Sequence, residues 1–447
     1  MGAGAETRPT NAVHGTTRSP SLLDLPVELL SSIFQHLQTH SIDSPNVTSG
    51  PPYEYLFICR SLYPLIHALR LRRLQLPVHP YTLQSKLAAL IRLPAAFQNV
   101  QDVRVSLSCY SFSELVAANL ALFKILRTLR VELDLAKPFS QPLFDTLAGL
   151  PCLQAFEMVR SPHDGHRSPW PSSFQRPLEQ VSVPIWSLQN GFLKQFLVSS
   201  RVKNLAIRVN QDYEIAILPW LWIDTLTLEF TDRLEHTPTL FLASLEEQLE
   251  MCELPHPVID RSSSLRHLVV DIHTKHFDLT ILLQRIRAAF KGCRLQTLRI
   301  TSSQRGFDIT KQEWAWPTLT SLELVMPITG IVRHPKSFKH TMSTLYTAIT
   351  QMPHLTHLTL ANVHFVECDC CRQQTVDDIL AHGDDSLART LTFPALMTFV
   401  GLLRAGSAVL DFRIRSSVGA LEEGREARWT RKSGGEDFAL EGRTVVA

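Results

Sequence analysis

The chain has 447 residues, of which 45% are hydrophobic and 19% charged, so most of it can build a core. Its formal net charge of +2 argues against a nucleic-acid-binding protein, which needs a clustered basic surface. No run of about 18 apolar residues occurs, so the sequence predicts no membrane span and no membrane partner.

The first 20 residues are rich in Gly, Ala, Thr, Ser and Pro and lack the apolar segment of a secretory signal. Residues 1–20 are therefore expected to be disordered. Without such a signal we expect a cytoplasmic or nuclear protein. In that reducing compartment the eight scattered cysteines are expected to remain thiols.

A helix is predicted to begin at Pro26, because Asp24 supplies an acceptor for the first turn and proline has a fixed φ that suits it. Leu29, Ile33, Phe34 and Leu37 then fall at helical spacing on one face. Together they form an apolar stripe too wide for one small helix to bury alone. Later helices or another protein must cover this stripe.

Two motifs in the region 21–76 resemble the two halves of an F-box, a small helical protein-docking module. The segment between the halves is longer here than in the family's pattern, and it contains proline and glycine residues. The first half reads Leu25-Pro26-x-Glu28-Leu29-x-x-x-Ile33-Phe34-x-x-Leu37, and the second reads Cys59-Arg60-Ser61-Leu62-Tyr63-Pro64-Leu65.

Beyond residue 76 a short template recurs, in which an apolar residue is followed by two variable, one apolar, one variable and one apolar residue. Most starts are 21 to 30 residues apart, and this template at this period is typical of leucine-rich repeats. The templates begin at Val100, Leu126, Leu153, Leu178, Val202, Ile223, Leu265, Leu295, Leu319 and Leu355.

Each template predicts a short strand whose alternate residues point inward. Helices with their own apolar stripes are predicted between strands, at 115–126, 192–198, 240–251, 281–290 and 338–352. One strand and one helix cannot bury their faces alone, so neighbouring repeats must stack into a solenoid, with parallel strands lining its concave surface. The alternative is a doubly wound parallel sheet, which the regular return of the template disfavours.

The expected fold class is thus α/β: a small N-terminal helical F-box at 21–76, followed by a leucine-rich-repeat solenoid of parallel strands and outer helices at 77–414. The last repeat is expected to be imperfect, reading Leu396-x-x-Phe399 and then Leu410-x-Phe412-x-Ile414. The tail at 415–447 is rich in Gly, Glu and Arg and is expected to be disordered.

One cluster of metal-ligating residue types occurs late in the chain. Thiolates and imidazoles are the usual ligands of zinc, but Cys-x-Cys-Cys is not a standard finger spacing, and adjacent cysteines hardly reach one metal together. The sequence therefore predicts a loop with free thiols and no metal site. The candidates for the alternative are His364, Cys368, Cys370, Cys371 and His382.

No catalytic motif is present, neither a phosphate-binding glycine loop nor a nucleophile elbow nor a His-Glu-x-x-His pair. Four tryptophans, Trp220, Trp222, Trp314 and Trp316, flank predicted strands or loops. Large aromatic side chains mostly pack in cores, although on the rim of a concave surface they also serve as interface anchors. Packing is the favoured interpretation for these four.

An F-box followed by leucine-rich repeats is similar to the substrate-recognition subunits of SCF ubiquitin ligases. The resemblance implies a non-catalytic adaptor without cofactor, whose F-box docks on Skp1 and through it on a cullin, while the repeats hold a target protein. The target and the residues that bind it are not identified. The implied Skp1-binding residues are Leu25, Pro26, Glu28, Leu29, Ile33, Phe34, Leu37, Cys59, Leu62, Tyr63 and Leu65.

Two alternatives stay open at this point. One is a Skp1-binding scaffold that acts outside ubiquitin ligation. The other is a metal-dependent enzyme that uses the loop at Cys368–Cys371.

Overall fold

A single sheet of fourteen strands runs through the computed structural model, and the strands lie side by side in the order in which they occur in the sequence. The structure describes residues 72–76, 88, 99–107, 119–133, 141–158, 177–191, 194–253, 263–274, 279–302, 316–325, 345–361, 400–403, 407–415, 424–431 and 439–446. Strands β1 to β12 are parallel to one another. The last two are added antiparallel.

The strands are short, as expected for units that each present only a few residues to the core. They are β1 (Arg73–Leu76), β2 (Asp102–Leu107), β3 (Thr128–Leu133), β4 (Ala155–Met158), β5 (Gln180–Pro184), β6 (Asn204–Val209), β7 (Thr225–Phe230), β8 (His267–Ile272), β9 (Thr297–Ser302), β10 (Ser321–Val325), β11 (His357–Ala361), β12 (Asp411–Arg415), β13 (Gly424–Thr430) and β14 (Ala439–Val446).

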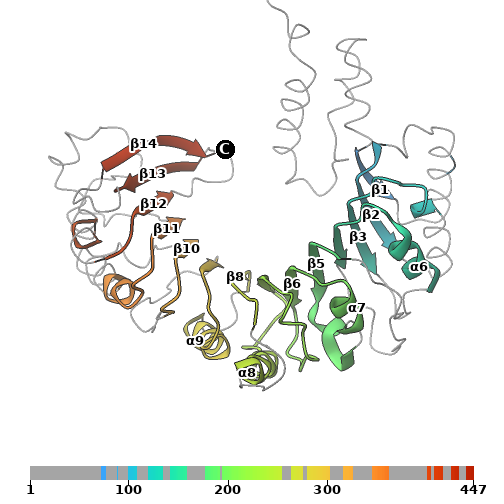
Figure 1. Cartoon of the computed structure of the whole chain (residues 1–447), viewed down its shortest axis with the longest axis horizontal. Helices are drawn as coiled ribbons and strands as arrows, with labels where there is room; N and C mark the ends of the chain where they lie inside the picture. The colour runs from blue at the N-terminus through green and yellow to red at the C-terminus, as the bar shows by residue number, and fades with distance from the viewer. Residues whose placement is uncertain are drawn as a thin grey trace, which may run out of the picture.

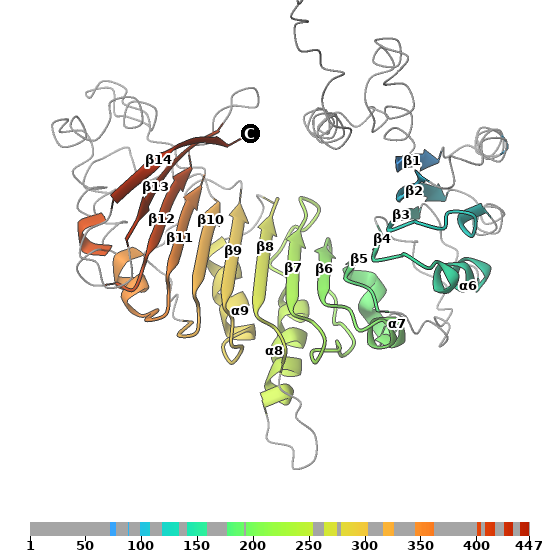
Figure 2. The ribbon, with the colours of Figure 1, turned by 45° about the horizontal axis from the view of Figure 1, so that its top comes forward.

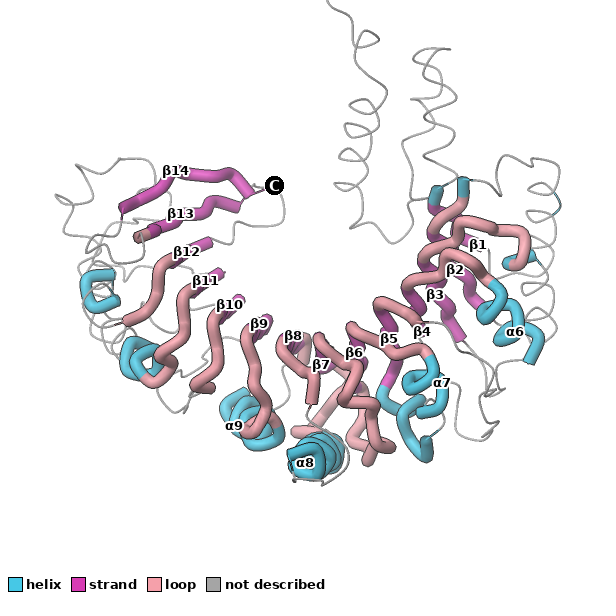
Figure 3. Tube along the Cα trace, in the orientation of Figure 1, coloured by secondary structure: helices cyan, strands magenta, loops and turns pink. Residues whose placement is uncertain are grey.

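The sheet bends into an arc with its strands on the inside and its helices on the outside (Figure 1). Figure 2 shows the same arc tilted, with the strands aligned across it, and Figure 3 separates the inner strands from the outer helices by colour. The labelled outer helices are α6 (Gln141–Gly149), α7 (Lys194–Ser199), α8 (Thr239–Glu253) and α9 (Leu279–Ala289), and a 3-10 helix, η3 (Ile185–Gly191), precedes α7.

This arrangement is an α/β structure with one mostly parallel sheet, compatible with a solenoid. A doubly wound sheet has a strand order that reverses and helices on both faces. Here the order is sequential, and the helices lie along one side of the sheet (Figure 3). The alternative fold raised by the sequence is therefore wrong.

The ten sequence templates produce β2 to β11. In every template the three apolar residues are at most 2% exposed. The pairing register aligns them from strand to strand, so that Leu226 of β7 lies beside Leu205 of β6 and Leu268 of β8. Burying one Leu or Val side chain contributes about 1.5–3 kcal/mol relative to exposure, so these stacked rows are the main stabilising feature of the sheet.

The sheet begins earlier than the sequence boundary at residue 76. Strand β1 pairs with β2, with Leu74 opposite Val103 and Leu76 opposite Val105. Leu74 and Leu76 are 7% and 2% exposed and extend the buried rows by one strand. The end of the region 21–76 thus belongs to the sheet, because this short segment has the same apolar alternation as the templates.

The expected disorder of residues 415–447 is wrong where the structure describes them. Strands β13 and β14 form an antiparallel hairpin on β12. The Trp429 ring stacks on Phe412 of β12, with 5.4 Å between ring centroids. The charged composition of the tail gave no indication of β13, in which the Trp429 side chain is buried against β12.

In the last parallel repeat Phe412 and Ile414 align with Leu358 and Leu360 of β11, as the expected pattern requires, but the buried residue before them is not the expected one. The fully buried residue that precedes Phe412 is Val409, whereas Leu410 is only half-buried. The template therefore reads Val409-x-x-Phe412-x-Ile414, and Leu396-x-x-Phe399 lies outside the described residues.

The predicted helices are confirmed in part. Helices α7, α8 and α9 fall in three of the expected ranges, and 345–350 is helical within a fourth. Within 115–126 the described residues show helix at 119–120 and turns from 121. Helix α6 was not expected.

Helix α8 is fixed to the preceding loop by two polar side chains. Asp212 accepts hydrogen bonds from the backbone N–H of Leu240 and Phe241, which satisfies the first turn of the helix. Gln248, 4% exposed, accepts from the Leu218 N–H at 2.9 Å and from the Trp220 indole at 3.3 Å. These bonds satisfy buried polar groups that would otherwise destabilise the loop.

Candidate functional site

The inside of the arc is formed by the side chains that alternate with the buried template residues, and we call it the concave face. In a parallel sheet these side chains stand in rows across the strands. Each strand from β2 to β11 buries two template residues, such as Leu129 and Val131 of β3, and the residue between them points to the concave face. We call the row of these intervening residues, with those aligned to them in β1, β12 and β13, the central row. Its members are Gln75, Arg104, Arg130, Glu157, Ser182, Ala206, Thr227, Val269, Arg299, Glu323, Thr359, Arg413 and Arg428.

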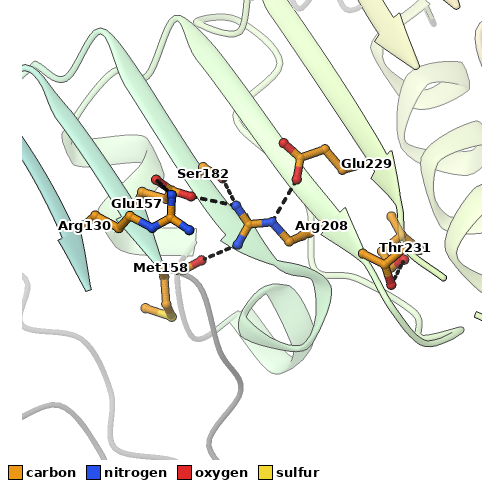
Figure 4. A network of polar contacts seen from close by, with 8 residues as sticks. Arg130, Glu157, Met158, Ser182, Arg208, Glu229 and Thr231 are labelled. Carbon is orange, nitrogen blue, oxygen red and sulfur yellow. Dashed lines mark hydrogen bonds and ion pairs between the residues drawn. The ribbon is translucent and has the colours of Figure 1, made fainter. Parts of the chain in front are cut away.

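Arg208 of β6 organises the part of the concave face between β3 and β7 (Figure 4). Its Nε donates to Glu229 of β7 at 2.8 Å, and its Nη2 donates to Glu157 of β4 at 2.7 Å. To reach β4 the side chain crosses β5, where Ser182 is small and accepts a longer bond of 3.4 Å. The contact thus joins residues that are 51 positions apart in the sequence.

The network continues to β3, because Arg130 lies 3.4 Å from the second carboxylate oxygen of Glu157. Burial alone would lower the pKa of Arg208, but hydrogen bonds and charge from Glu229 and Glu157 outweigh it and raise the pKa. The guanidinium therefore stays charged. Four side chains of alternating charge, on β3, β4, β6 and β7, are thus linked by ion pairs across this part of the concave face.

A second polar cluster lies at the C-terminal end, around Asp411 of β12. Its carboxylate is 7% exposed and accepts hydrogen bonds from two guanidiniums: Arg413 at 2.7 Å and Arg428 at 3.0 Å. Burial alone would raise the pKa of Asp411, but the bonds and charges of the two arginines hold it below its ordinary value of 3.8. We call these three residues the Asp411 cluster.

In other ion pairs on this face the arginine side chain is more exposed than its carboxylate partner. Arg73 is 42% exposed and its partner Asp102 32%. Arg299 is 51% exposed and its partner Glu323 25%, with 3.8 Å between nitrogen and oxygen. A partner approaching these pairs meets guanidinium groups before carboxylates. Arg208 is the opposite case, since it is buried more deeply than Glu229.

One group of side chains has the residue types of a catalytic relay. The His267 Nδ1 lies 2.7 Å from Thr297 Oγ1, while the Asp224 carboxylate lies 3.7 Å from His267 Nε2. The second distance is too long for a hydrogen bond, so the carboxylate does not orient the ring as a relay requires. We therefore assign these residues to the polar concave surface and not to catalysis.

The sequence-predicted sites lie outside the described residues. This holds for all eleven Skp1-binding positions between Leu25 and Leu65 and for the metal-ligand candidates His364, Cys368, Cys370, Cys371 and His382. Within the described ranges no group of three or more His, Cys, Asp or Glu side chains could hold a metal ion. Among the same residues no helix has the length and apolarity needed to cross a bilayer.

The described tryptophans differ in burial, which tests the prediction that they pack in the core. Trp220 and Trp316 are 2% and 3% exposed, and their indole nitrogens donate to Gln248 and to the Phe290 carbonyl. Trp222 is 41% exposed, with the Arg201 guanidinium 5.0 Å from its ring centroid. The favoured packing interpretation is thus confirmed for two of them and wrong for Trp222; Trp314 lies outside the described residues.

Sequence reasoning did not identify the concave charge network, although a signal for it exists. When the templates are aligned, Arg130, Glu157, Arg299 and Glu323 fall at the same variable position. Charged residues at a position that faces away from the core mark an exposed row. The diagonal bond from Arg208 to Glu157 depends on the small residue at Ser182, which alignment alone does not reveal.

Comparisons with protein-family models, with curated proteins and with solved structures found no match for this chain.

Proposed function

We propose that the chain is the substrate-recognition subunit of an SCF ubiquitin ligase, built from an F-box and a leucine-rich-repeat solenoid and working in the cytoplasm or nucleus. The F-box docks on Skp1, and the solenoid holds a target protein. The observation that supports this most is the combination of the Leu25–Leu37 motif with a sequential, curved sheet whose concave face carries charged side chains. Extended concave surfaces of stacked repeats are suited to binding other proteins.

In this proposal the chain positions a target and performs no chemistry. Leu29, Ile33 and Leu37 recur at four-residue spacing, the pattern by which an amphipathic helix enters a groove of its partner. Ubiquitin transfer is carried out by other subunits. The absence of a catalytic motif from the sequence agrees with such a division of labour.

The test is co-purification with Skp1 of the full chain and of the double variant Ile33→Asp, Phe34→Asp. Two buried charges in the docking stripe abolish recovery of Skp1 and the cullin, while the thermal melt of the sheet is unchanged. As a matched control, Ser31→Asp with Gln35→Asp places the same charges at neighbouring positions outside the motif and retains Skp1. Equal recovery of Skp1 with the docking-stripe variant contradicts the proposal.

A second measurement separates the adaptor from a Skp1-binding scaffold. For an adaptor, a target protein accumulates when the gene is deleted and is stabilised by the Ile33/Phe34 variant. For a scaffold, Skp1 binds but no protein accumulates. Zinc analysis of the purified chain addresses the loop at Cys368–Cys371, and a stoichiometric content would favour the metal-dependent alternative.

A further inference from the structure

The C-terminal end of the concave face carries an uneven distribution of charge. In the central row from β9 to β13 the residues are Arg299, Glu323, Thr359, Arg413 and Arg428. Glu323, which pairs with Arg299, is 25% exposed, whereas the three arginines are 31–51% exposed. Among the described side chains of this row, the most exposed charges are therefore positive.

The Asp411 cluster strengthens this asymmetry. Arg413 and Arg428 face each other across the antiparallel pair β12–β13, where like charges directly opposite are destabilising. Asp411, two residues from Arg413 on β12, accepts hydrogen bonds from both guanidiniums and compensates part of the repulsion. In this cluster the carboxylate is the buried member, at 7% exposure, and the guanidiniums are the exposed ones, at 31% and 40%.

We infer that this end of the concave face binds an extended acidic segment of the target protein. The inference rests on the proposed role of the concave face as the target-binding surface and adds the chemistry of the target. Guanidinium groups form paired hydrogen bonds with carboxylates, which suits an acidic side chain placed over Arg413 and Arg428. A basic segment is disfavoured by the same charges.

The geometry also gives the spacing of the acidic residues. Arg299 and Arg413 are three strands apart, which corresponds to about 14 Å at the usual strand separation. An extended chain advances about 3.3 Å per residue, so two acidic residues four positions apart span about 13 Å. The segment therefore crosses the strands with one acidic side chain over the Asp411 cluster and the other over Arg299. Neutral residues lie between, above Glu323 and Thr359.

The test measures binding of labelled peptides to the purified full chain by fluorescence anisotropy. The probe is a glycine–serine peptide with two glutamates four positions apart, and the matched peptides carry two lysines or two adjacent glutamates. The glutamate pair with the four-residue spacing binds tightest, and its affinity falls with salt because charge contacts are screened. Equal binding of the lysine peptide contradicts the inference.

Variants locate the site. Arg299→Gln lies away from the hairpin and lowers affinity about twofold to fivefold, the size expected for one exposed ion pair. The triple variant Asp411→Asn, Arg413→Gln, Arg428→Gln keeps the size of residue 411, shortens the other two side chains while keeping them polar, leaves no buried unpaired charge, and lowers affinity at least as much. Lys291→Gln is the control, since Lys291 pairs with Glu250 of the outer helix α8. An equal loss with Lys291→Gln shows unspecific attraction and overturns the site.

Two further outcomes separate the inference from the proposed function. A single-stranded oligonucleotide that binds more tightly than the glutamate peptide and depends on the same arginines would identify a nucleic-acid surface and overturn the inference. Skp1 co-purification is measured on the same variants. Retained Skp1 with no peptide binding refutes the acidic target alone, whereas peptide binding without Skp1 refutes the adaptor alone.

Discussion

Arg208 forms hydrogen bonds with residues of two other repeats that are distant in the sequence. It bonds to Glu229 on the next strand and to Glu157 two strands back, and it crosses β5 over Ser182. Its side chain is 20% exposed, so the surrounding water screens these bonds less than it screens an open surface pair. The four strands β4 to β7 are thereby held in one register.

Replacing Arg208 by methionine keeps most of the apolar stem and removes the guanidinium. We expect a loss of about 2 kcal/mol in the free energy of unfolding, because charged hydrogen bonds are lost and Glu229 is left half-buried. Urea denaturation measures it. Arg299→Met is the matched control, and its loss is at most about 0.5 kcal/mol because that pair is long and exposed. Equal losses in the two variants would show that the crossing adds no stability.

The contribution of Asp411 to the stability of the C-terminal hairpin is expected to depend on pH. Its pKa is held below the ordinary 3.8 by Arg413 and Arg428 against the effect of burial. A carboxylate with a lowered native pKa stabilises the fold above its unfolded pKa, and this contribution is lost as the pH falls through the native pKa. We therefore expect the wild type to be more stable than Asp411→Asn at pH 7, and the difference to shrink below about pH 4. Thermal melts of both proteins between pH 7 and pH 2.5 test this, and a constant difference contradicts it.

At the scale of elements, the C-terminal hairpin closes one end of the buried rows. Phe412 is fully buried and Trp429 is 5% exposed, and their rings stack with an interplanar angle of 24°. Without β13, Phe412 would lie at an open sheet end. A stack of parallel strands needs such a capping unit because its terminal strand has a neighbour on one side only.

Trp429→Ala is expected to release the hairpin from β12. Removal of a buried tryptophan typically costs about 3–5 kcal/mol, more than a two-stranded hairpin provides by itself. Hydrogen exchange in β12 to β14 should become faster, while β2 to β4 keep their protection. Thr430→Ala, at the adjacent half-buried position, is the control and leaves exchange nearly unchanged. Unaltered protection of β13 in Trp429→Ala would show that the stack does not hold the hairpin.

The strands β2 to β11 were predictable because each places three apolar residues at fixed spacing, and burial of these residues decides the structure. Strand β1 was missed because Leu74 and Leu76 had been assigned to the helical region before it. The hairpin was missed because the tail at 415–447 is rich in Gly, Glu and Arg; among the side chains of β13 that the structure describes, Trp429 is the buried one, at 5% exposure. For the candidate site, the aligned variable positions indicate charged rows, but the Asp411 cluster requires β13, which composition alone did not suggest.

At the scale of the whole molecule, the sheet is a linear array. Its strand order equals the sequence order, so each strand pairs only with its neighbours in the chain. Stability in such an array is close to a sum of repeat and interface terms, and local opening starts most easily at the ends. The centre, β6 to β9, is flanked on both sides and carries α8 and α9.

Two matched core truncations test this linear coupling. Leu228→Ala removes a fully buried side chain from β7 at the centre of the array, and Leu74→Ala removes a 7% exposed side chain from β1 at its end. Each deletion costs about 2–5 kcal/mol locally. We expect Leu228→Ala to accelerate hydrogen exchange in strands on both sides of β7, because both halves lose an interface. Leu74→Ala should accelerate exchange only in β1 and the strands next to it. Equal acceleration of exchange along the whole sheet by both variants would contradict this, because the fourteen strands would then unfold as one cooperative unit. A destabilising change in any strand would in that case lower the stability of the whole concave face.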